Sequence, residues 1–97
     1  MKIYLAGKIS GDPNYKAKFQ KAAQKIEQDT RQPVLNPALL PNGLSPEDYM
    51  QICFSEIGRA DVVAFLPDWE DSEGAKLEHA YCRYVGKPIL HLKESDL

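Results

Sequence analysis

The residues best suited to chemistry lie between Trp69 and Glu78, where a predicted helix begins. Ser72 is a natural N-cap, because its hydroxyl can accept a hydrogen bond from a backbone N–H of the first turn. Gly74 and Glu78 are four residues apart and share one helix face, so the missing side chain at Gly74 leaves space in front of the Glu78 carboxylate. The positive end of the helix dipole lies nearby. This spacing predicts a site where an anionic ligand meets an ionised glutamate.

The alternative interpretation of Glu78 is a solvated surface charge. On a helix, such a charge is often paired with a residue three or four positions away. Those positions hold Gly74, Ala75, Tyr81 and Cys82, none of which can form an ion pair. Glu78 also borders an apolar stripe, so we expect its side chain to lean toward the sheet. The stripe consists of Leu77, Tyr81, Tyr84 and Val85. The pattern favours a functional carboxylate.

A second candidate segment is the glycine-containing loop at residues 7–11, which follows the first predicted strand. Gly7, Lys8 and Ser10 could form an anion-binding loop there. The glycines do not have the spacing of the dinucleotide-binding fingerprint, and the Gly-Lys-Ser/Thr ending of a P-loop is missing. The loop is therefore a stronger candidate for anion binding only if it lies opposite Ser72 in the fold.

Other residues have structural alternatives. Tyr4 lies in a strand, where a tyrosine usually serves packing. Trp69 could be a lid, a platform for a flat ring, or a hydrophobic side chain covering an edge. Asp61 precedes an apolar run, and we expect it to cap or end the preceding helix. His79 and His91 have no cysteine or carboxylate near them at metal-ligand spacing, so we expect neither a metal nor a cofactor.

Strands and helices alternate along the chain, and this order must position the candidate residues. Predicted strands cover residues 2–6, 33–36, 62–66 and 88–91. Predicted helices cover residues of about 14–29, 45–60 and 72–86. The alternation predicts right-handed βαβ units and a parallel sheet. We expect a three-layer α/β/α sandwich, with an open Rossmann- or flavodoxin-like sheet of about four strands in the order 2-1-3-4.

Ligands of such sheets bind beyond the carboxyl ends of the strands, at the point where the strand order reverses. Here that point lies between the first and third strands. The loops that follow Ala6 and Leu66 should therefore face each other across one crevice. This would bring the loop at Gly7 opposite Ser72 and Glu78.

The composition limits the number of domains and the classes of partner that the chain can have. The chain has 97 residues, which suits one domain spanning residues 1–97. A net charge of −2 argues against a broad basic face for a nucleic-acid polymer or an anionic membrane. No apolar run approaches the length of a membrane span, and the first residues lack a signal-peptide layout. Cys53 and Cys82 are predicted to be reduced, partly buried thiols of a cytoplasmic protein.

Over most of its length, the chain resembles the nucleoside 2-deoxyribosyltransferase-like superfamily, which includes deoxyribonucleoside 5′-monophosphate N-glycosidases. Residues 4–11 are similar to the opening strand and glycine loop, and residues 60–63 to the start of the third strand. The spacing Ser72-x-Gly74-x-x-x-Glu78 is similar to the family's Ser/Asp-x-Gly-x-x-x-Glu motif. The chain also resembles a group of short phage and bacterial proteins. Features shared with that group are Asn36-Pro37, Tyr49-Met50 and Trp-x-x-Ser-x-Gly-Ala-x-x-Glu at residues 69–78.

The resemblance implies an enzyme that breaks an N-glycosyl bond of a nucleoside or nucleotide. Glu78 matches the nucleophile that attacks the anomeric carbon and holds a covalent deoxyribosyl intermediate. Water or a second base then takes the sugar. Tyr4 matches a tyrosine beside that glutamate and the sugar. Ser72 and Gly74 match positions around the sugar 5′ end or its phosphate.

The remaining implied binding residues come from the loop after the first strand and from the shared signatures. Gly7 and Ser10 would complete the pocket, and Lys8 could supply charge. Asn36 and Trp69 are candidate substrate-binding residues. A neighbouring subunit closes the site in related enzymes, which implies a homodimer or a higher even oligomer. Its interface would cover apolar side chains at Tyr49, Met50, Phe54 and Tyr84.

Two departures from the family pattern leave the activity open. The N-glycosidases have an aspartate that assists departure of the base, and Cys53 occupies that position here. Ser10 stands where the family has a phosphate-binding arginine. The alternative function is therefore a non-catalytic nucleotide-binding or sensing module of phage or bacterial origin. A small scaffold with a vestigial cleft is a third possibility, which a Glu78 salt-bridged on the surface would support.

Overall fold

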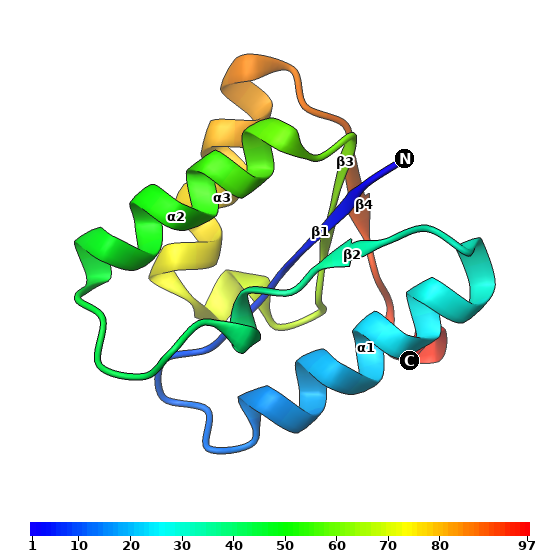
Figure 1. Cartoon of the computed structure of the whole chain (residues 1–97), viewed down its shortest axis with the longest axis horizontal. Helices are drawn as coiled ribbons and strands as arrows, with labels where there is room; N and C mark the ends of the chain where they lie inside the picture. Colours follow the sequence, from blue (N-terminus) through cyan, green and yellow to red (C-terminus); the bar gives the residue numbers. More distant parts are fainter.

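The computed structural model describes residues 1–97 as a parallel four-stranded sheet with helices on both faces (Figure 1). The strands lie in the order β2-β1-β3-β4, as predicted. Their bounds are β1 Ile3–Ala6, β2 Val34–Leu35, β3 Val62–Phe65 and β4 Ile89–His91. The helices are α1 Tyr15–Thr30, α2 Pro46–Arg59 and α3 Glu73–Val85. Three single 3-10 turns are η1 Pro37–Leu39, η2 Trp69–Asp71 and η3 Glu94–Asp96.

The two faces of β1 are packed against different helices. Ile3 and Leu5 point into a core shared with α1, whereas Tyr4 and Ala6 point into a core shared with α2 and α3. Both faces are apolar, as expected for a central parallel strand that is covered on each side. The fold is thus a three-layer α/β/α sandwich, with α1 on one face and α2 and α3 together on the other (Figure 1). This alternation is what directs the Tyr4 side chain toward α3.

Local signals set the ends of these helices, and the predicted Ser72 cap is confirmed. Ser45 caps α2 through a reciprocal pair of hydrogen bonds with Asp48, and a proline follows at the first helical position. Ser72 caps α3, because its Oγ accepts a hydrogen bond from the Ala75 N–H at 3.1 Å. Gly86 ends α3 in the left-handed conformation at φ 79°.

Two local expectations were wrong. Asp61 does not cap or end the preceding helix; its Oδ2 accepts a hydrogen bond from the Lys2 N–H at 2.6 Å. The reason is tertiary, since pairing of β1 with β3 brings the free donor at the start of β1 beside Asp61. The predicted apolar stripe of α3 is also partly exposed: Leu77 is 55% and Tyr84 is 92% exposed. The side of α3 that faces the sheet is made by Ala75, Glu78 and Cys82 instead.

Both cysteines are free, as predicted, and they are more completely buried than expected. Burial raises the pKa of the Cys53 thiol to about 12 and that of the Cys82 thiol to about 11. Both thiols are therefore protonated at neutral pH. None of the helices combines the length and the apolar character needed to cross a bilayer.

Gly7 lies directly against Leu66, the residue that follows β3. A Cβ atom at this position would lie 2.7 Å from Cδ1 and 2.9 Å from Cβ of Leu66. Gly7→Ala is therefore expected to lower the free energy of unfolding by about 1–3 kcal/mol, since the buried Leu66 has little room to move. Urea unfolding at pH 7 measures the change.

Gly58→Ala is the matched control for this prediction. Gly58 lies in α2, and a Cβ atom there would meet nothing within 4 Å. The control variant is expected to keep or gain stability, by up to about 1 kcal/mol, because alanine favours the helix. Equal unfolding midpoints for Gly7→Ala and the unmodified protein would contradict the close packing of Gly7 on Leu66.

Candidate functional site

The centre of the candidate site is a hydrogen bond between two buried side chains. The Tyr4 hydroxyl donates to Glu78 Oε2 at 2.5 Å, across 74 positions of sequence. Tyr4 is fully buried and Glu78 is 5% exposed. Tyr4 comes from the central strand β1, and Glu78 comes from the face of α3 that packs on the sheet. The carboxylate is therefore held in one orientation by a rigid strand.

These two residues lie at the edge of a cavity of about 570 Å³. The wall from β1 and its loop includes Tyr4, Gly7 and Ser10, and the wall from α3 includes Ser72, Gly74 and Glu78. The third wall comes from α2 and the segment before it, with Leu44, Pro46, Tyr49, Met50 and Cys53. The volume is in the range of small-molecule sites in proteins. Six of the nine residues proposed from the sequence thus share one cavity.

Glu78 has an unusual protonation equilibrium. Burial raises the pKa of its carboxyl from 4.5 to about 7, and the nearby carboxylate of Glu56 acts in the same direction. Hydrogen bonding from Tyr4 opposes this rise, as does the neighbouring Cys53 thiol. Burial and the Glu78 charge also raise the pKa of Tyr4 well above its ordinary value. Near neutral pH, Glu78 therefore exists as a mixture of carboxylate and acid, and Tyr4 remains a hydrogen-bond donor.

Cys53 and Glu56 complete the surroundings of Glu78 on the α2 side. Cys53 lines the cavity, and burial raises the pKa of its thiol so that it is a weak proton donor at neutral pH. Glu56 lies outside the cavity lining, and its Oε1 atom is buried without a hydrogen-bond partner. Burial raises the pKa of Glu56 as well. The helix that carries these two residues thus supplies no ready proton donor to the cavity.

The start of α3 provides polar groups at the mouth of the cavity. The Ser72 oxygen is engaged as the helix cap, which leaves its hydroxyl proton free to donate. A Cβ atom at Gly74 would lie 3.2 Å from Cε of Met50, so a side chain there would press on the α2 wall. The absence of a side chain at Gly74 therefore keeps this end of the cavity open.

The charge of the cavity lining is negative. Asp71, Glu73 and Glu78 are among the lining residues, and no lysine, arginine or histidine is. Lys8 lies outside the lining, and its backbone N–H donates to Asp68 Oδ1 at 3.1 Å. The nearby ammonium of Lys18 is bound by Asp12 and Asp68 and donates to the Lys8 carbonyl at 2.9 Å. The basic groups at this end of the sheet thus hold the loops together.

Residues 1–91 match the model of a protein family described as a domain of unknown function, DUF4406. The chain belongs to the DUF4406 family. The matched residues include all four strands and every residue that lines the cavity of Glu78. No curated protein and no solved structure matches the chain.

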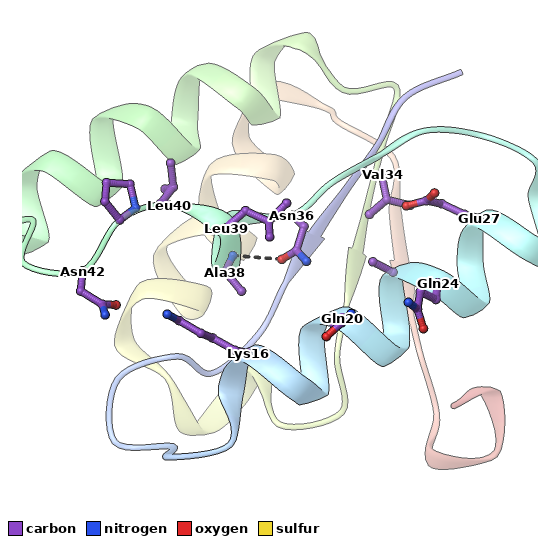
Figure 2. Close-up of a pocket in the computed structure, with 12 residues that line it drawn as sticks. Lys16, Gln20, Gln24, Glu27, Val34, Asn36, Ala38, Leu39, Leu40 and Asn42 are labelled. Atoms are coloured by element: carbon purple, nitrogen blue, oxygen red, sulfur yellow. Dashed lines mark hydrogen bonds between the residues drawn. The ribbon is translucent and has the colours of Figure 1, made fainter.

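Asn36 lies away from the Glu78 cavity of this DUF4406 domain. Its side-chain oxygen accepts a hydrogen bond from the Ala38 N–H at 2.9 Å and so caps η1. Asn36 lines a second cavity of about 670 Å³, located between α1 and the segment from β2 through η1 (Figure 2). Side chains of Lys16 and Gln20 from α1 border this cavity on the other side (Figure 2). The structure thus gives Asn36 a structural hydrogen bond at a different place.

Trp69 also lies outside the Glu78 cavity of the DUF4406 domain. Its ring stacks on the His79 ring, with centroids 4.1 Å apart, and packs edge-on against Phe65 at 5.6 Å. His91 completes this aromatic cluster. Of the alternatives left open for Trp69, the packing corresponds most closely to a partly buried hydrophobic side chain that covers the edge of the sheet.

Sequence reasoning missed two features. The α2 wall was not proposed as part of the site, although the Tyr49-Met50 pair had been noted as a shared signature and both residues line the cavity. The meeting of His79 and His91 was also missed, because residues on a helix and a strand have no common spacing to reveal it. No group of three or more His, Cys, Asp or Glu side chains is arranged to hold a metal ion.

Proposed function

We propose that this protein cleaves the N-glycosyl bond of a nucleoside, as a 2-deoxyribosyltransferase or an N-glycosidase with Glu78 as nucleophile. The observation that carries the proposal is the buried Glu78 carboxyl, oriented by Tyr4 at the edge of a cavity suited to a small molecule. Membership of the nucleoside 2-deoxyribosyltransferase-like superfamily is part of the proposal. The pattern Ser72-x-Gly74-x-x-x-Glu78 supports it.

The proposed reaction has two steps. In the first, a Glu78 carboxylate oxygen forms a bond to the anomeric carbon while the bond from that carbon to the base nitrogen breaks. The departing base takes a proton from solvent water, and the Cys53 thiol is only a weak proton donor at neutral pH. In the second, water or another base attacks the anomeric carbon and loses a proton, and the Glu78 carboxylate is released. Tyr4 holds Oε2 throughout and leaves Oε1 to react.

The charges around the cavity favour a neutral nucleoside over a nucleotide as substrate. A 5′-phosphate would meet the carboxylates of Asp71 and Glu73 without a lysine or arginine in the lining to balance them. The N–H groups of Glu73 and Gly74, which the Ser72 cap does not engage, remain as donors for a sugar hydroxyl. Tyr49 and Met50 offer an apolar surface for a base. We therefore propose 2′-deoxynucleosides as the substrate class.

The proposal is tested by incubating the protein with a panel of 2′-deoxynucleosides and their 5′-monophosphates, each with and without a second free base. Chromatography then measures released base and newly formed nucleoside. We expect release from nucleosides, faster than from the monophosphates. New nucleoside would identify transfer, and free sugar would identify hydrolysis. Absence of release from every compound, or turnover that survives Glu78→Ala, would contradict the proposal.

The second candidate is a non-catalytic nucleoside- or nucleotide-binding module. The inert Cys53 thiol favours it, because this residue lines the cavity where the resemblance implies an acid. This alternative predicts that a nucleoside raises the unfolding temperature while no base is released. Binding of that kind shifts the folding equilibrium by mass action and needs no chemistry.

The pH dependence of turnover gives a separate prediction. Because the nucleophile must be ionised, kcat/KM for the unmodified protein is expected to rise with pH through the Glu78 pKa of about 7. Tyr4→Phe removes a hydrogen bond that stabilises the carboxylate, so the inflection is expected to move upward by about one pH unit. The measurement is the pH–rate profile of both proteins.

Tyr15→Phe serves as the control for Tyr4→Phe. The Tyr15 hydroxyl is exposed and donates to Asn42 Oδ1 at 3.1 Å, outside the Glu78 cavity. Its profile should coincide with that of the unmodified protein. A Tyr4→Phe profile with an unchanged or lower inflection would show that the titrating group is not the Glu78 carboxyl held by Tyr4.

Assembly into a homodimer or a higher even oligomer stays a prediction. The apolar surface available for it on α3 consists of Leu77, Tyr84 and Val85, each more than half exposed. Leu77 also lines the Glu78 cavity. A second copy that covers this part of α3 would therefore help to close the proposed site.

A further inference from the structure

The only two histidines of the chain meet on the surface, outside the Glu78 cavity. His79 comes from α3 and His91 from the end of the edge strand β4. Their Nε2 atoms lie 3.4 Å apart. This separation exceeds the usual 2.7–3.2 Å, approximately, of a good N–H hydrogen bond. A direct hydrogen bond is therefore a weak explanation for the pairing of these two rings.

The separation does suit two ligands of one metal ion. Imidazole nitrogens bind Zn²⁺ at about 2.0–2.1 Å with tetrahedral geometry, which places two ligand nitrogens about 3.3–3.4 Å apart. The observed Nε2–Nε2 distance of 3.4 Å has this value.

Aromatic contacts hold both rings in place. The His79 ring stacks on Trp69 with an interplanar angle of 13°, and its centroid lies 5.0 Å from that of Phe65. The His91 centroid lies 5.5 Å from that of Trp69 and 5.8 Å from that of Phe65. Phe65 is itself fully buried, so this support is rigid. Two ligands fixed in this way lose little conformational freedom when an ion binds.

Charged groups of both signs lie near His79. Glu70 is close enough to act electrostatically on this imidazole, and its negative charge favours a nearby cation. Arg83 also acts on the ring, and its positive charge opposes a cation. The affinity of the site for an ion is therefore expected to come from the two imidazole ligands.

We propose that His79 and His91 form a surface site for a divalent transition-metal ion of the class that prefers imidazole, namely Zn²⁺, Ni²⁺ or Cu²⁺. The two histidines are the protein ligands. Because the pair is exposed, water can occupy the other coordination positions of the ion. Imidazole nitrogens suit these ions, whereas Mg²⁺ and Ca²⁺ prefer oxygen ligands. The site does not share a residue with the Glu78 cavity, so it stands independently of the proposed enzymatic function.

Trp69 provides a built-in reporter, because it is the only tryptophan and it stacks on one of the two ligands. Titration with Cu²⁺ at pH 7.5 is expected to quench its fluorescence and to saturate at one equivalent. Zn²⁺, which does not quench, should restore the emission by competition, and a chelator should restore it fully. Calorimetry with Zn²⁺ alone should give one site per chain.

His91→Ala is the decisive variant, since it removes one exposed ligand and leaves the stack of Trp69 on His79. The Cu²⁺ concentration for half-maximal quenching is expected to rise at least about tenfold. Removal of a residue that only contacts a metal ligand already weakens metal binding by about that much. Lys93→Ala, two positions further along the chain and also exposed, is the matched control and should titrate like the unmodified protein. His79→Ala should likewise abolish Zn²⁺ binding in calorimetry.

Two outcomes would overturn the proposal. One is a His91→Ala variant that binds Cu²⁺ and Zn²⁺ as tightly as the unmodified protein, which would assign the binding to other surface groups. The other is an unmodified protein that neither loses Trp69 fluorescence with Cu²⁺ nor binds Zn²⁺ in calorimetry. That result would leave the two imidazoles as a packing contact only.

Discussion

Glu78→Gln is expected to reduce base release from a 2′-deoxynucleoside by at least about 10³-fold, because an amide cannot form the covalent bond to the anomeric carbon. The change is nearly isosteric. The glutamine oxygen can still accept the hydrogen bond that Tyr4 now donates to Oε2, so the side chain should keep its place. Single-turnover measurement of released base separates this loss from any change in product release.

The variant is also expected to bind the nucleoside, since the walls of the cavity stay intact. Glu94→Gln is the control, because Glu94 is exposed in η3 and does not line the cavity. It should release base at the rate of the unmodified protein. Turnover of Glu78→Gln within about tenfold of that rate would show that the carboxylate is not the nucleophile, and the binding-module alternative would then account better for the cavity.

Glu78→Gln is expected to stabilise the fold at pH 8, by about 3 kcal/mol. The pKa of this carboxyl rises from 4.5 to about 7 on folding, so the folded state retains a proton that the unfolded chain releases. Between these two pH values, the stability of the unmodified protein therefore falls as the pH rises. Above pH of about 7, the whole cost of burying the charge is present. A neutral glutamine does not carry that cost.

The measurement is the unfolding temperature of both proteins at pH 5 and pH 8. A gain of about 3 kcal/mol corresponds to a rise of more than about 10 °C for a domain of this size. At pH 5, most of the difference should be gone, because the buried carboxyl is then protonated in the folded protein. Glu94→Gln should show no comparable dependence, since its exposed carboxyl stays hydrated in both states.

The opposite stability change would contradict the predicted cost of burying the Glu78 charge. If Glu78→Gln were less stable than the unmodified protein at pH 8, the ionised carboxylate would be a stabilising element of the fold. The charge would then be compensated by Tyr4 and other groups more fully than its burial indicates. The two Glu78→Gln predictions are independent, because the first follows from bond formation and the second from desolvation of the charge.

Much of the fold could be predicted from the sequence, because its signals are local. Apolar runs of strand length, separated by amphipathic segments, predict a parallel sheet, and general rules for the connections in such sheets favour the observed order 2-1-3-4. Ser45, Ser72 and Gly86 set helix ends through atoms only a few positions away. Glu78 does lie on the sheet-facing side of α3, as expected, but the apolar stripe from which this was inferred is partly exposed.

The tertiary structure alone decided which side chains meet. Tyr4 and Glu78 are 74 positions apart, and their hydrogen bond depends on how α3 is rotated against β1. The same packing buries Cys82 of α3 while leaving Tyr84 exposed, and it puts Lys8, Asn36 and Trp69 outside the cavity. It also brings His79 against His91. These contacts arise from long-range packing of helices on the sheet, for which no local pattern in the chain carries a signal.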